Sequence, residues 1–351
     1  MSEAGIPCLW MRGGSSKGAY FLAGDLPADP AERDDLLLRI MGGPDALQID
    51  GIGGGSPLTS KVAILGKSLS PEADVDYLFL QVFVDRPVVS AAQGCGNLLA
   101  GVGPAAIERG LVPVRPGITP VRIRMLNTGE VAEARVRTPG GQVSYRGDAS
   151  ISGVPGHHAP IELLFRNIAG SSCGALLPTG NAVDEIEGVC CTLIDNGMPV
   201  VVLRASDFGL TGIESPDALE ADASLKQKLE SIRLRAGQRM GLGDVAESSV
   251  PKVALVSSPR TGGVLSVRCF IPHRVHASLG VFAAVSVATA SLLEAGPAAE
   301  LAQLPADHRF RLEHPSGQIE VVLDRGAGGL VVGAGTTRTA RKLFEGHVFP
   351  A

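Results

Sequence analysis

Aromatic side chains are scarce in this chain. Phe, Trp and Tyr make up 4% of the 351 residues, so flat ligands such as nucleobases would find few stacking partners. No run of lysines and arginines interrupts a sequence whose formal net charge is -5. This excludes broad electrostatic attraction to nucleic acid or to an anionic membrane. An anionic ligand must therefore be bound by a few well-placed cations and amides.

The cysteine pattern excludes a small disulfide-stapled domain. The chain has no Cys-x-x-Cys pair and no even framework of closely spaced cysteines. Its first 17 residues carry Glu3 and only a short apolar stretch, which is not the layout of a secretory signal. We expect a cytoplasmic protein with reduced thiols, most of them small buried hydrophobes. The six cysteines are at positions 8, 95, 173, 190, 191 and 269.

Three common motifs are also missing. Met11–Gly18 is rich in glycine but lacks the order of glycine, lysine and serine or threonine that a P-loop requires. Asp50–Ala63 contains several glycines, yet a strand pattern follows them instead of preceding them, which disfavours a dinucleotide fingerprint. No convincing Gly-x-Ser-x-Gly motif is present, so the sequence gives no support to serine hydrolase chemistry.

What the chain does contain is enough apolar material for two domains. With 45% hydrophobic residues, it can bury two substantial cores. Strand patterns outnumber helical ones. They occur at Lys61–Leu65, Tyr77–Val84, Val121–Met125, Ile161–Phe165, Cys190–Ile194, Pro199–Leu203, Val253–Val256, Leu265–Ile271, Ile319–Leu323 and Leu330–Gly333.

Helical periodicity is clearest in four segments, Ala31–Met41, Asn97–Arg109, Leu219–Met240 and Ala277–Ala295. The second and the fourth are apolar on nearly every face, as expected for helices enclosed by sheet. Ala277–Ala295 also resembles a membrane span, but serines and a threonine interrupt it and it barely reaches the required length. A buried helix is the better prediction. The amphipathic Leu219–Met240 predicts a surface helix.

These elements predict an α+β fold with two pseudo-symmetric domains, residues 1–175 and 176–351. We expect each domain to wrap its mixed or antiparallel strands around one central helix, near 96–110 and near 277–295. We expect both helix N-termini to face a shared cleft, with the last residues packing back on the first half. Strand edges that remain exposed would suit a homodimer.

The first candidate catalytic residue is Cys95. It stands between Gly94 and Gly96, and Asn97 opens the apolar helix pattern. A thiol at a helix N-terminus is stabilised as thiolate by the free amides and the positive end of the helix dipole, which makes it a usable base or nucleophile. A buried structural cysteine at a tight turn is the alternative that this local sequence leaves open.

The second candidate is Lys61, which begins an apolar strand pattern. A lysine is costly there unless it serves a cleft, and desolvation would favour its neutral amine, a possible general base. The alternative is a solubilising lysine at a strand edge. Lys61 and Cys95 together could form an acid/base pair in which one group takes a proton and the other returns it.

Other groups are candidates for binding anions. Ser15, Ser16 and Lys17 lie in the glycine-rich segment, which could hold a carboxylate or be a solvated turn. Arg260, His276 and the amide of Ser278 lie next to the second central helix, where they could bind substrate carboxylates. His273 and His276 have no carboxylate or thiol at ligand spacing, so we expect no metal site.

Taken together, several motifs resemble the PrpF family of isomerases. The resemblance runs through nearly the whole chain. It is carried by Arg12–Gly18, Gly51–Gly54, Thr59–Ala63, Gly94–Asn97, Leu177–Asn181, Ile194–Pro199, Pro272–Arg274, His276–Ser278 and Glu313–Gly317.

The resemblance implies a diaminopimelate epimerase-like fold and a cofactor-independent proton shift on a small unsaturated tricarboxylate. Lys61 and Cys95 match the family's catalytic lysine and cysteine, and Gly96 and Asn97 would join the substrate-binding groups. The epimerases have a second cysteine where this chain has His276–Ser278, so a lysine with one thiol replaces a pair of thiols. Two alternatives stay open: a different tricarboxylate substrate, and a non-catalytic binding protein that retains the cleft.

Overall fold

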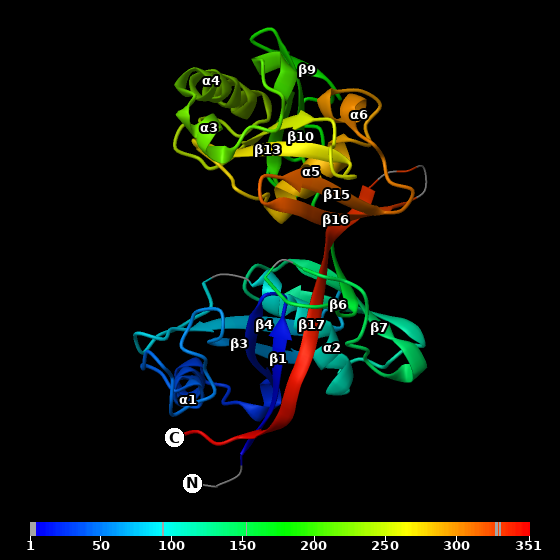
Figure 1. Ribbon diagram of the computed structural model, residues 1–351. Helices are drawn as coiled ribbons and strands as arrows, with labels where there is room; N and C mark the ends of the chain where they lie inside the picture. The colour runs from blue at the N-terminus through cyan, green and yellow to red at the C-terminus, as the bar shows by residue number, and fades with distance from the viewer. Residues whose placement is uncertain (1–4, 93–94, 152, 327–328, 330) are drawn as a thin grey trace. The chain divides into compact units, whose positions relative to one another are not determined.

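A computed structural model describes residues 5–92, 95–151, 153–326, 329 and 331–351 of the chain (Figure 1). Glu3, Gly94 and Leu330, which entered the sequence patterns above, lie outside the described residues. The chain forms two compact units: Met1–Leu163 together with Thr337–Ala351, and Leu164–Thr336. The units therefore divide at Leu163/Leu164 and not at residue 175, and the segment Thr337–Ala351 belongs to the first unit.

The first unit is a set of strands with two helices, α1 (Pro30–Met41) and α2 (Gly96–Glu108). Two short 3-10 turns, η1 (Ala23–Asp25) and η2 (Pro139–Gly141), connect its elements. Its strands are β1 (Ile6–Gly13), β2 (Ser16–Leu22), β3 (Lys61–Lys67), β4 (Val75–Val82), β5 (Val89–Ser90), β6 (Gly117–Met125) and β7 (Val131–Thr138), with parts of β8 (Pro160–Arg166) and β17 (Val331–Val348).

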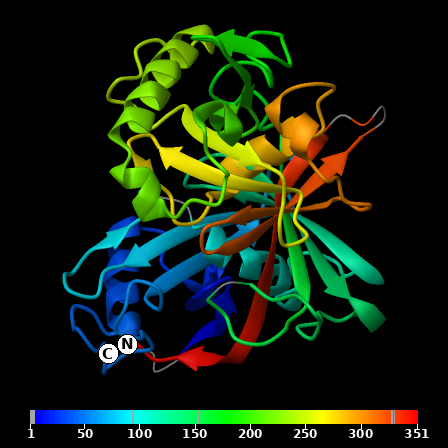
Figure 2. The ribbon, with the colours of Figure 1, turned by 45° about the horizontal axis from the view of Figure 1, so that its top comes forward.

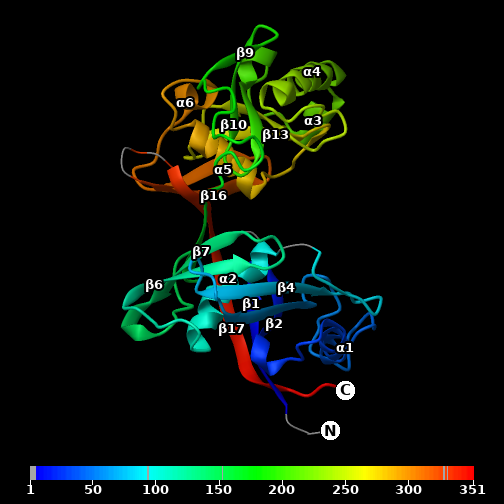
Figure 3. The same cartoon turned by 180° about the vertical axis from the view of Figure 1, so that it is seen from behind.

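Local sequence fixes both ends of α1. The Asp29 carboxylate accepts hydrogen bonds from the amides of Ala31 and Glu32, and Pro30 occupies the first helical position. Gly42 ends the helix in the left-handed region at φ 77°. The helix buries its apolar stripe in a core cluster with one face of strands β2, β3 and β4. Figure 3 shows α1 and these strands from behind.

Helix α2 is the central helix of the first unit. Residues Leu98 to Ala106 are all buried, and the helix contacts strands β1, β2, β3, β4, β6 and β7. Close packing requires a glycine at position 101, because a Cβ there would lie 2.3 Å from the Tyr20 hydroxyl oxygen. The expected helix near 96–110, enclosed by strands, is confirmed.

The second unit has more helix. Its helices are α3 (Pro216–Ala221), α4 (Ala223–Arg239), α5 (Val281–Ala290) and α6 (Pro297–Leu301), with a 3-10 turn η3 (Ala205–Phe208). Figure 2 shows α4 alongside the strands of this unit. The strands are β9 (Asp184–Ile186), β10 (Val189–Asp195), β11 (Pro199–Arg204), β12 (Lys252–Ser257), β13 (Leu265–Ile271), β14 (Arg274–Val275), β15 (Arg309–His314) and β16 (Gly317–Arg325), with the remaining parts of β8 and β17.

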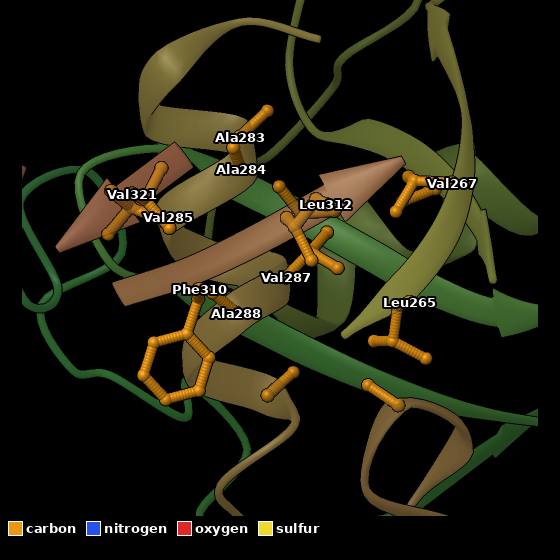
Figure 4. Close-up of a cluster of buried hydrophobic side chains, with 14 of the residues drawn as sticks. Leu265, Val267, Ala283, Ala284, Val285, Val287, Ala288, Phe310, Leu312 and Val321 are labelled. Atoms are coloured by element: carbon orange, nitrogen blue, oxygen red, sulfur yellow. The ribbon is translucent and has the colours of Figure 1, made fainter. Parts of the chain in front are cut away.

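Helix α5 is the central helix of the second unit. All residues from Ala283 to Ala290 are buried, and the helix packs against Phe310 and Leu312 of β15 and Val321 of β16 (Figure 4). Its ten residues are fewer than the segment Ala277–Ala295 predicts, because the helix begins only after Gly280 and ends at a turn after Ala290. No helix among the described residues combines the length and the apolar character that a bilayer-crossing segment needs.

The two units repeat one topology. In the first, β1–β2 is antiparallel, β2–β3 parallel, β3–β4 antiparallel, β4–β6 parallel and β6–β7 antiparallel. In the second, the pairs β10–β11, β11–β12, β12–β13, β13–β15 and β15–β16 follow the same alternation. The central helix enters at the same point each time, before β6 and before β15. The pseudo-symmetric α+β architecture is confirmed.

Candidate active site

The glycine-rich segment Met11–Gly18 is a β-hairpin packed on the first turn of α2. Strand β1 ends at Gly13 and β2 begins at Ser16. A Cβ at Gly14 would lie 2.4 Å from the Asn97 side-chain oxygen, and one at Gly13 would lie 2.7 Å from the Asn97 carbonyl oxygen. Gly14 also has φ 53°, which favours glycine. The two glycines therefore allow the hairpin to approach the helix N-terminus.

Ser16 has a buried hydroxyl without a partner. Its side chain is 2% exposed, and Oγ makes no hydrogen bond within the described structure. Such an orphaned polar group costs free energy unless a ligand or water satisfies it. Ser15 and Lys17, its neighbours, are exposed. Of the three predicted residues of this segment, Ser16 has the surroundings of a ligand-binding group.

Strand register places Lys61 on the side of the sheet that faces α2. Val62 and Ile64 belong to the core cluster on the α1 side. Because successive side chains alternate between faces, Lys61 and Ala63 point to the other side. Ser16 lies on that same side, since Ala19 of β2 belongs to the α1-side cluster and pairs with Val62.

Lys61 is 8% exposed and has two contacts that orient its ammonium. Nζ donates a hydrogen bond to Gln81 Oε1 at 2.7 Å, and it lies 4.9 Å from the centroid of the Phe79 ring. Gln81 is the residue that pairs with Lys61 across β3 and β4. As predicted, Lys61 begins a buried strand, and it is held by an amide and an aromatic face.

Cys95 is the N-cap of α2. The helix begins at Gly96, and no side chain caps it. Its first amides therefore stay available to an anion, and the thiol lies at the positive end of the helix dipole. Cys95 is half-buried. The Tyr77 hydroxyl donates a hydrogen bond of 3.5 Å to the Cys95 carbonyl oxygen, which ties the N-cap to β4.

Tyr77 and Phe79 connect Cys95 with Lys61. Both alternate with Leu78 and Leu80 on β4, and Leu80 faces α1, so both point toward α2. Tyr77 contacts Cys95 and Phe79 contacts the Lys61 ammonium. Burial, followed by the nearby Cys95, raises the pKa of Tyr77 well above its usual range, so this phenol remains protonated. The lysine and the cysteine thus lie on the same side of the sheet.

In the second unit, His276 and Ser278 are joined by a short contact. The Ser278 amide donates to His276 Nδ1 at 2.9 Å, so the amide that the sequence assigns to a substrate carboxylate already has a partner. In this bond Nδ1 is the acceptor, so Nε2 is the ring nitrogen of His276 that remains to donate to a ligand. Helix α5 begins three residues later, at Val281, with Gly280 as N-cap.

His314 belongs to the same group, and motif reasoning did not single it out. Its Nε2 lies 3.5 Å from Ser278 Oγ, and its Nδ1 lies 3.2 Å from Ser316 Oγ. Burial, together with His276 and Arg268, lowers the pKa of His314, which favours the neutral ring. The sequence feature that could have identified His314 is its position in Glu313–Gly317. This motif carries the family resemblance but had no assigned role.

Arg260 lies apart from this group. Its backbone amide donates to Glu313 Oε2 at 2.9 Å, and Glu313 and His314 are consecutive residues of β15, so their side chains point to opposite faces. Arg260 is one of the residues that line a cavity of about 300 Å³. The other lining residues are Ser206, Leu210, Thr211, Val256, Ser257, Ser258, Pro259 and Leu301.

The described residues hold no cluster of three or more His, Cys, Asp or Glu side chains with the arrangement of a metal site. His273 is one of the two histidines considered for that role, and its Nδ1 lies 3.7 Å from Glu230 Oε2.

The model of the family described as "PrpF protein" matches residues 3–350. The chain is 61% identical to a protein of Novosphingobium sp. (strain KA1) named "(4E)-oxalomesaconate Delta-isomerase", with 98% of this chain and 97% of that protein covered. It is 57% identical to "4-oxalomesaconate tautomerase" of Pseudomonas putida, with coverage of 99% and 97%.

Among solved structures, a methylitaconate Δ-isomerase is similar, with a TM-score of 0.86 and 35% identity. The match covers 99% of this chain and 96% of the other. At this identity and coverage, the whole of both units has a counterpart in that enzyme, which confirms the expected fold class.

Proposed function

The chain belongs to the PrpF family, and we propose that it is an isomerase that moves a proton within the conjugated system of 4-oxalomesaconate. The two relatives with 61% and 57% identity carry names for isomerisation of this tricarboxylate. The alternative substrate is 2-methylaconitate, which has a methyl group in place of an oxo-bearing arm. The reaction needs no cofactor.

One arrangement carries the proposal: a lysine and a thiol on the same side of a sheet, beside a free helix N-terminus and an orphaned hydroxyl. The uncapped amides of α2 supply donors for an anion. Ser16 Oγ supplies another donor that no residue satisfies. A tricarboxylate brings the acceptors that such groups require.

In the proposed mechanism, Lys61 and Cys95 share the proton chemistry. One group removes a proton from a carbon next to a carbonyl, and the electron pair spreads through the conjugated system as a dienolate. The other group then delivers a proton to the far end of that system, so the product has the same atoms as the substrate. The proposal assigns the base and the acid to Lys61 and Cys95 as a pair, without dividing the two roles between them.

The surrounding groups stabilise the dienolate charge. The Lys61 ammonium, the Gly96 and Asn97 amides and the Ser16 hydroxyl are donors fixed before the substrate arrives, and such preorganised electrostatics lower a barrier by several kcal/mol. Lys17 is left out, because it is exposed and alternates with Ser16 on β2, so its side chain points to the other face of the sheet. In the second unit, His276, Ser278 and His314 form a separate group of candidate carboxylate ligands, and Arg260 is left out because Glu313, to which its amide donates, points to the opposite face of β15 from His314.

The direct test is NMR of 4-oxalomesaconate in deuterated water with the purified protein. We expect isomer formation and uptake of deuterium at carbon with the native chain. Cys95→Ser and Lys61→Met are each expected to abolish exchange while the circular dichroism spectrum and melting temperature remain those of a folded protein. Full activity in both variants would refute the assignment.

Two control experiments separate the alternatives. The same assay with 2-methylaconitate identifies the preferred tricarboxylate through the ratio of the kcat/KM values. Calorimetric binding of either compound without any deuterium uptake would identify a non-catalytic binding protein and overturn the proposal.

A further inference from the structure

Gln81 has only one possible orientation. Its side chain is 6% exposed, and Nε2 donates to the carbonyl oxygens of Ser60 at 2.9 Å, Pro57 at 3.2 Å and Val82 at 3.3 Å. All three neighbours are acceptors, so the amide nitrogen fits there and the amide oxygen does not. Oε1 is thereby directed at Lys61, whose Nζ donates to it at 2.7 Å.

A second buried amide holds the segment on which Gln81 depends. Gln48 is 1% exposed, and its Nε2 donates to Ser60 Oγ at 2.7 Å. Gln48 Oε1 accepts from the Gly55 amide at 3.1 Å. These bonds fix Ser60, and its carbonyl in turn fixes Gln81. The result is a satisfied buried network that ends at the Lys61 ammonium.

The acceptor of Lys61 is neutral. In the described part of the chain no carboxylate forms an ion pair with Lys61, and Lys61 has no interaction beyond those named. On the side of the sheet that faces α2, the titratable groups of the elements packed around Lys61 are Tyr20 on β2, Tyr77 on β4 and Cys95 at the start of α2. Asp76 on β4 and Glu108 at the end of α2 form ion pairs with Arg124 and Lys342. The loop residues Asp50 and Asp85 and the strand residue Lys17 are exposed.

An amide oxygen orients an ammonium without the large stabilisation that an opposite charge gives. A carboxylate at the same place would hold the proton on Lys61 strongly, whereas an acid/base residue has to exchange it. The three carbonyl oxygens around Nε2 favour an amide at position 81, because they would repel the oxygen of an ionised carboxylate in the same place.

We propose that Gln81 is the positioning residue of Lys61: it fixes the direction of the amine and, as a neutral acceptor, leaves the amine free to gain and lose its proton during turnover. The proposal rests on the role assigned to Lys61 in the proposed function. It adds that Gln81, which does not touch substrate, sets the pH at which Lys61 works.

Two substitutions test this with opposite signs. Gln81→Glu places a negative charge beside the ammonium, so the pH-dependent limb of kcat that belongs to Lys61 moves to higher pH, by about one pH unit or more. Gln81→Met removes the acceptor and disfavours the ammonium, so the same limb moves to lower pH. We also expect kcat to fall about 10- to 100-fold in Gln81→Met with little change in KM, as for a misplaced catalytic group.

A matched control is Gln142→Glu, the same chemical change at an exposed position of the first unit. It should leave the pH profile unchanged. Both Gln81 variants lose donors to buried carbonyls, so their melting temperatures are recorded alongside. A purely structural role would lower stability in both without moving the pH limb in opposite directions, and that result would overturn the proposal.

A readout independent of activity separates this inference from the proposed function. Competitive labelling with acetic anhydride over a pH series, followed by peptide mass spectrometry, measures the fraction of Lys61 present as free amine. The pH at which half of Lys61 is present as free amine should be higher in Gln81→Glu and lower in Gln81→Met than in the native protein. Failure of the native protein to isomerise a tricarboxylate refutes the proposed function alone. Unmoved labelling curves refute the role of Gln81.

Discussion

Lys252 holds the position in the second unit that Lys61 holds in the first. Each is the first residue of the third strand of the repeated topology, β12 and β3. Lys252 alternates with Val253, whose side chain belongs to the core on the α4 side, so it points to the side of α5. Both lysines therefore lie on the side of their sheet that faces the central helix.

The groups around the two lysines differ. Continuing the register of Val253 and Phe270 by one residue places Ile271 opposite Lys252, where Lys61 has Gln81. The N-cap of α5 is Gly280, where α2 has Cys95. The second unit thus repeats the lysine without its acceptor and without the thiol at the helix. The fold is duplicated and the acid/base pair is not.

Substitution of the two lysines should therefore have different effects. Burial lowers the pKa of Lys252, which means that its charge is disfavoured in the folded state. Lys252→Met is expected to keep isomerase activity and to leave the melting temperature unchanged or higher. Lys61→Met is expected to abolish activity. Loss of deuterium exchange in folded Lys252→Met would contradict the interpretation that the acid/base pair lies in the first unit alone.

Ser16→Ala tests the orphaned hydroxyl. Because Oγ has no partner in the folded chain, its removal is expected to leave thermal stability unchanged or slightly raised, while kcat/KM falls through loss of a substrate contact. Thr119→Val is the control, since Thr119 Oγ1 accepts from the Arg115 amide at 2.9 Å. It should cost about 1 kcal/mol of stability without affecting KM. A large stability loss in Ser16→Ala would contradict the prediction.

Gly14→Ala tests the close approach of the hairpin to α2. The new methyl would overlap the Asn97 side chain, and φ 53° adds strain, so both stability and activity should fall. Gly129→Ala is matched, because Gly129 has φ 80° but no atom within 4 Å of the added Cβ. Gly129→Ala should lose about 1–2 kcal/mol of stability from its left-handed backbone conformation and should retain activity. Equal effects in both variants would argue against a role of this contact.

Glu313→Gln tests a buried carboxylate in the second unit. Burial alone would raise its pKa, but the amides of Arg260, Thr261 and Gly263 outweigh this and lower it. A depressed pKa gives stability that is present above the unfolded value and is lost as pH falls through the folded value. We expect the variant to lose about 1–3 kcal/mol at pH 7 and to approach the native protein at the acid end. The exposed Glu247→Gln should change nothing at either pH.

Alkylation should distinguish Cys95 from the buried thiols. Burial raises the pKa of Cys8 and of Cys269 to about 12, which leaves almost no thiolate near neutral pH. The reagent is iodoacetamide at about pH 7.5, where a buried thiol with a pKa of about 12 is almost fully protonated. Peptide mass spectrometry should find Cys95 modified before Cys8 and Cys269. Bound tricarboxylate should slow that reaction. Modification of Cys8 first would contradict the assignment of Cys95.

Long apolar segments were the most predictable part of the fold. Lys61–Leu65, Leu265–Ile271 and Asn97–Arg109 correspond closely to β3, β13 and α2, because each is buried along nearly its whole length and its sequence pattern reflects that. The acid/base candidates followed from the same segments. A lysine at the start of a buried strand is costly unless it is used, and a thiol at a helix N-terminus is stabilised as thiolate.

Elements rich in small residues were missed. The hairpin β1–β2 has Gly13, Gly14 and Gly18 where they approach α2 and β3, so its composition suggested a turn. Strand β7 buries Ala132 and Ala134, whose small side chains give a weak strand pattern. The segment Leu219–Met240 is two helices, because Asp222 caps α4 through its bond to the Leu225 amide.

The tertiary partners of the site residues could not be read from the sequence. Gln81 is separated from Lys61 by 20 residues and His314 from Ser278 by 36. Neither pairing has a spacing signature, since the first depends on strand register and the second on where the loop before α5 meets the end of β15. The different surroundings of Arg260 likewise depend on which face of β15 receives Glu313.

The discontinuity of the first unit has a consequence for synthesis on the ribosome. Strand β1 pairs with β17 along Ile6–Gly13, and the partners, from Ala340 to Val348, are translated after the whole of Leu164–Thr336. Until then one edge of β1 has unpaired amides and carbonyls, and such an exposed strand edge promotes aggregation. The unit that carries the lysine and the thiol therefore completes its sheet last, after the second unit has left the exit tunnel.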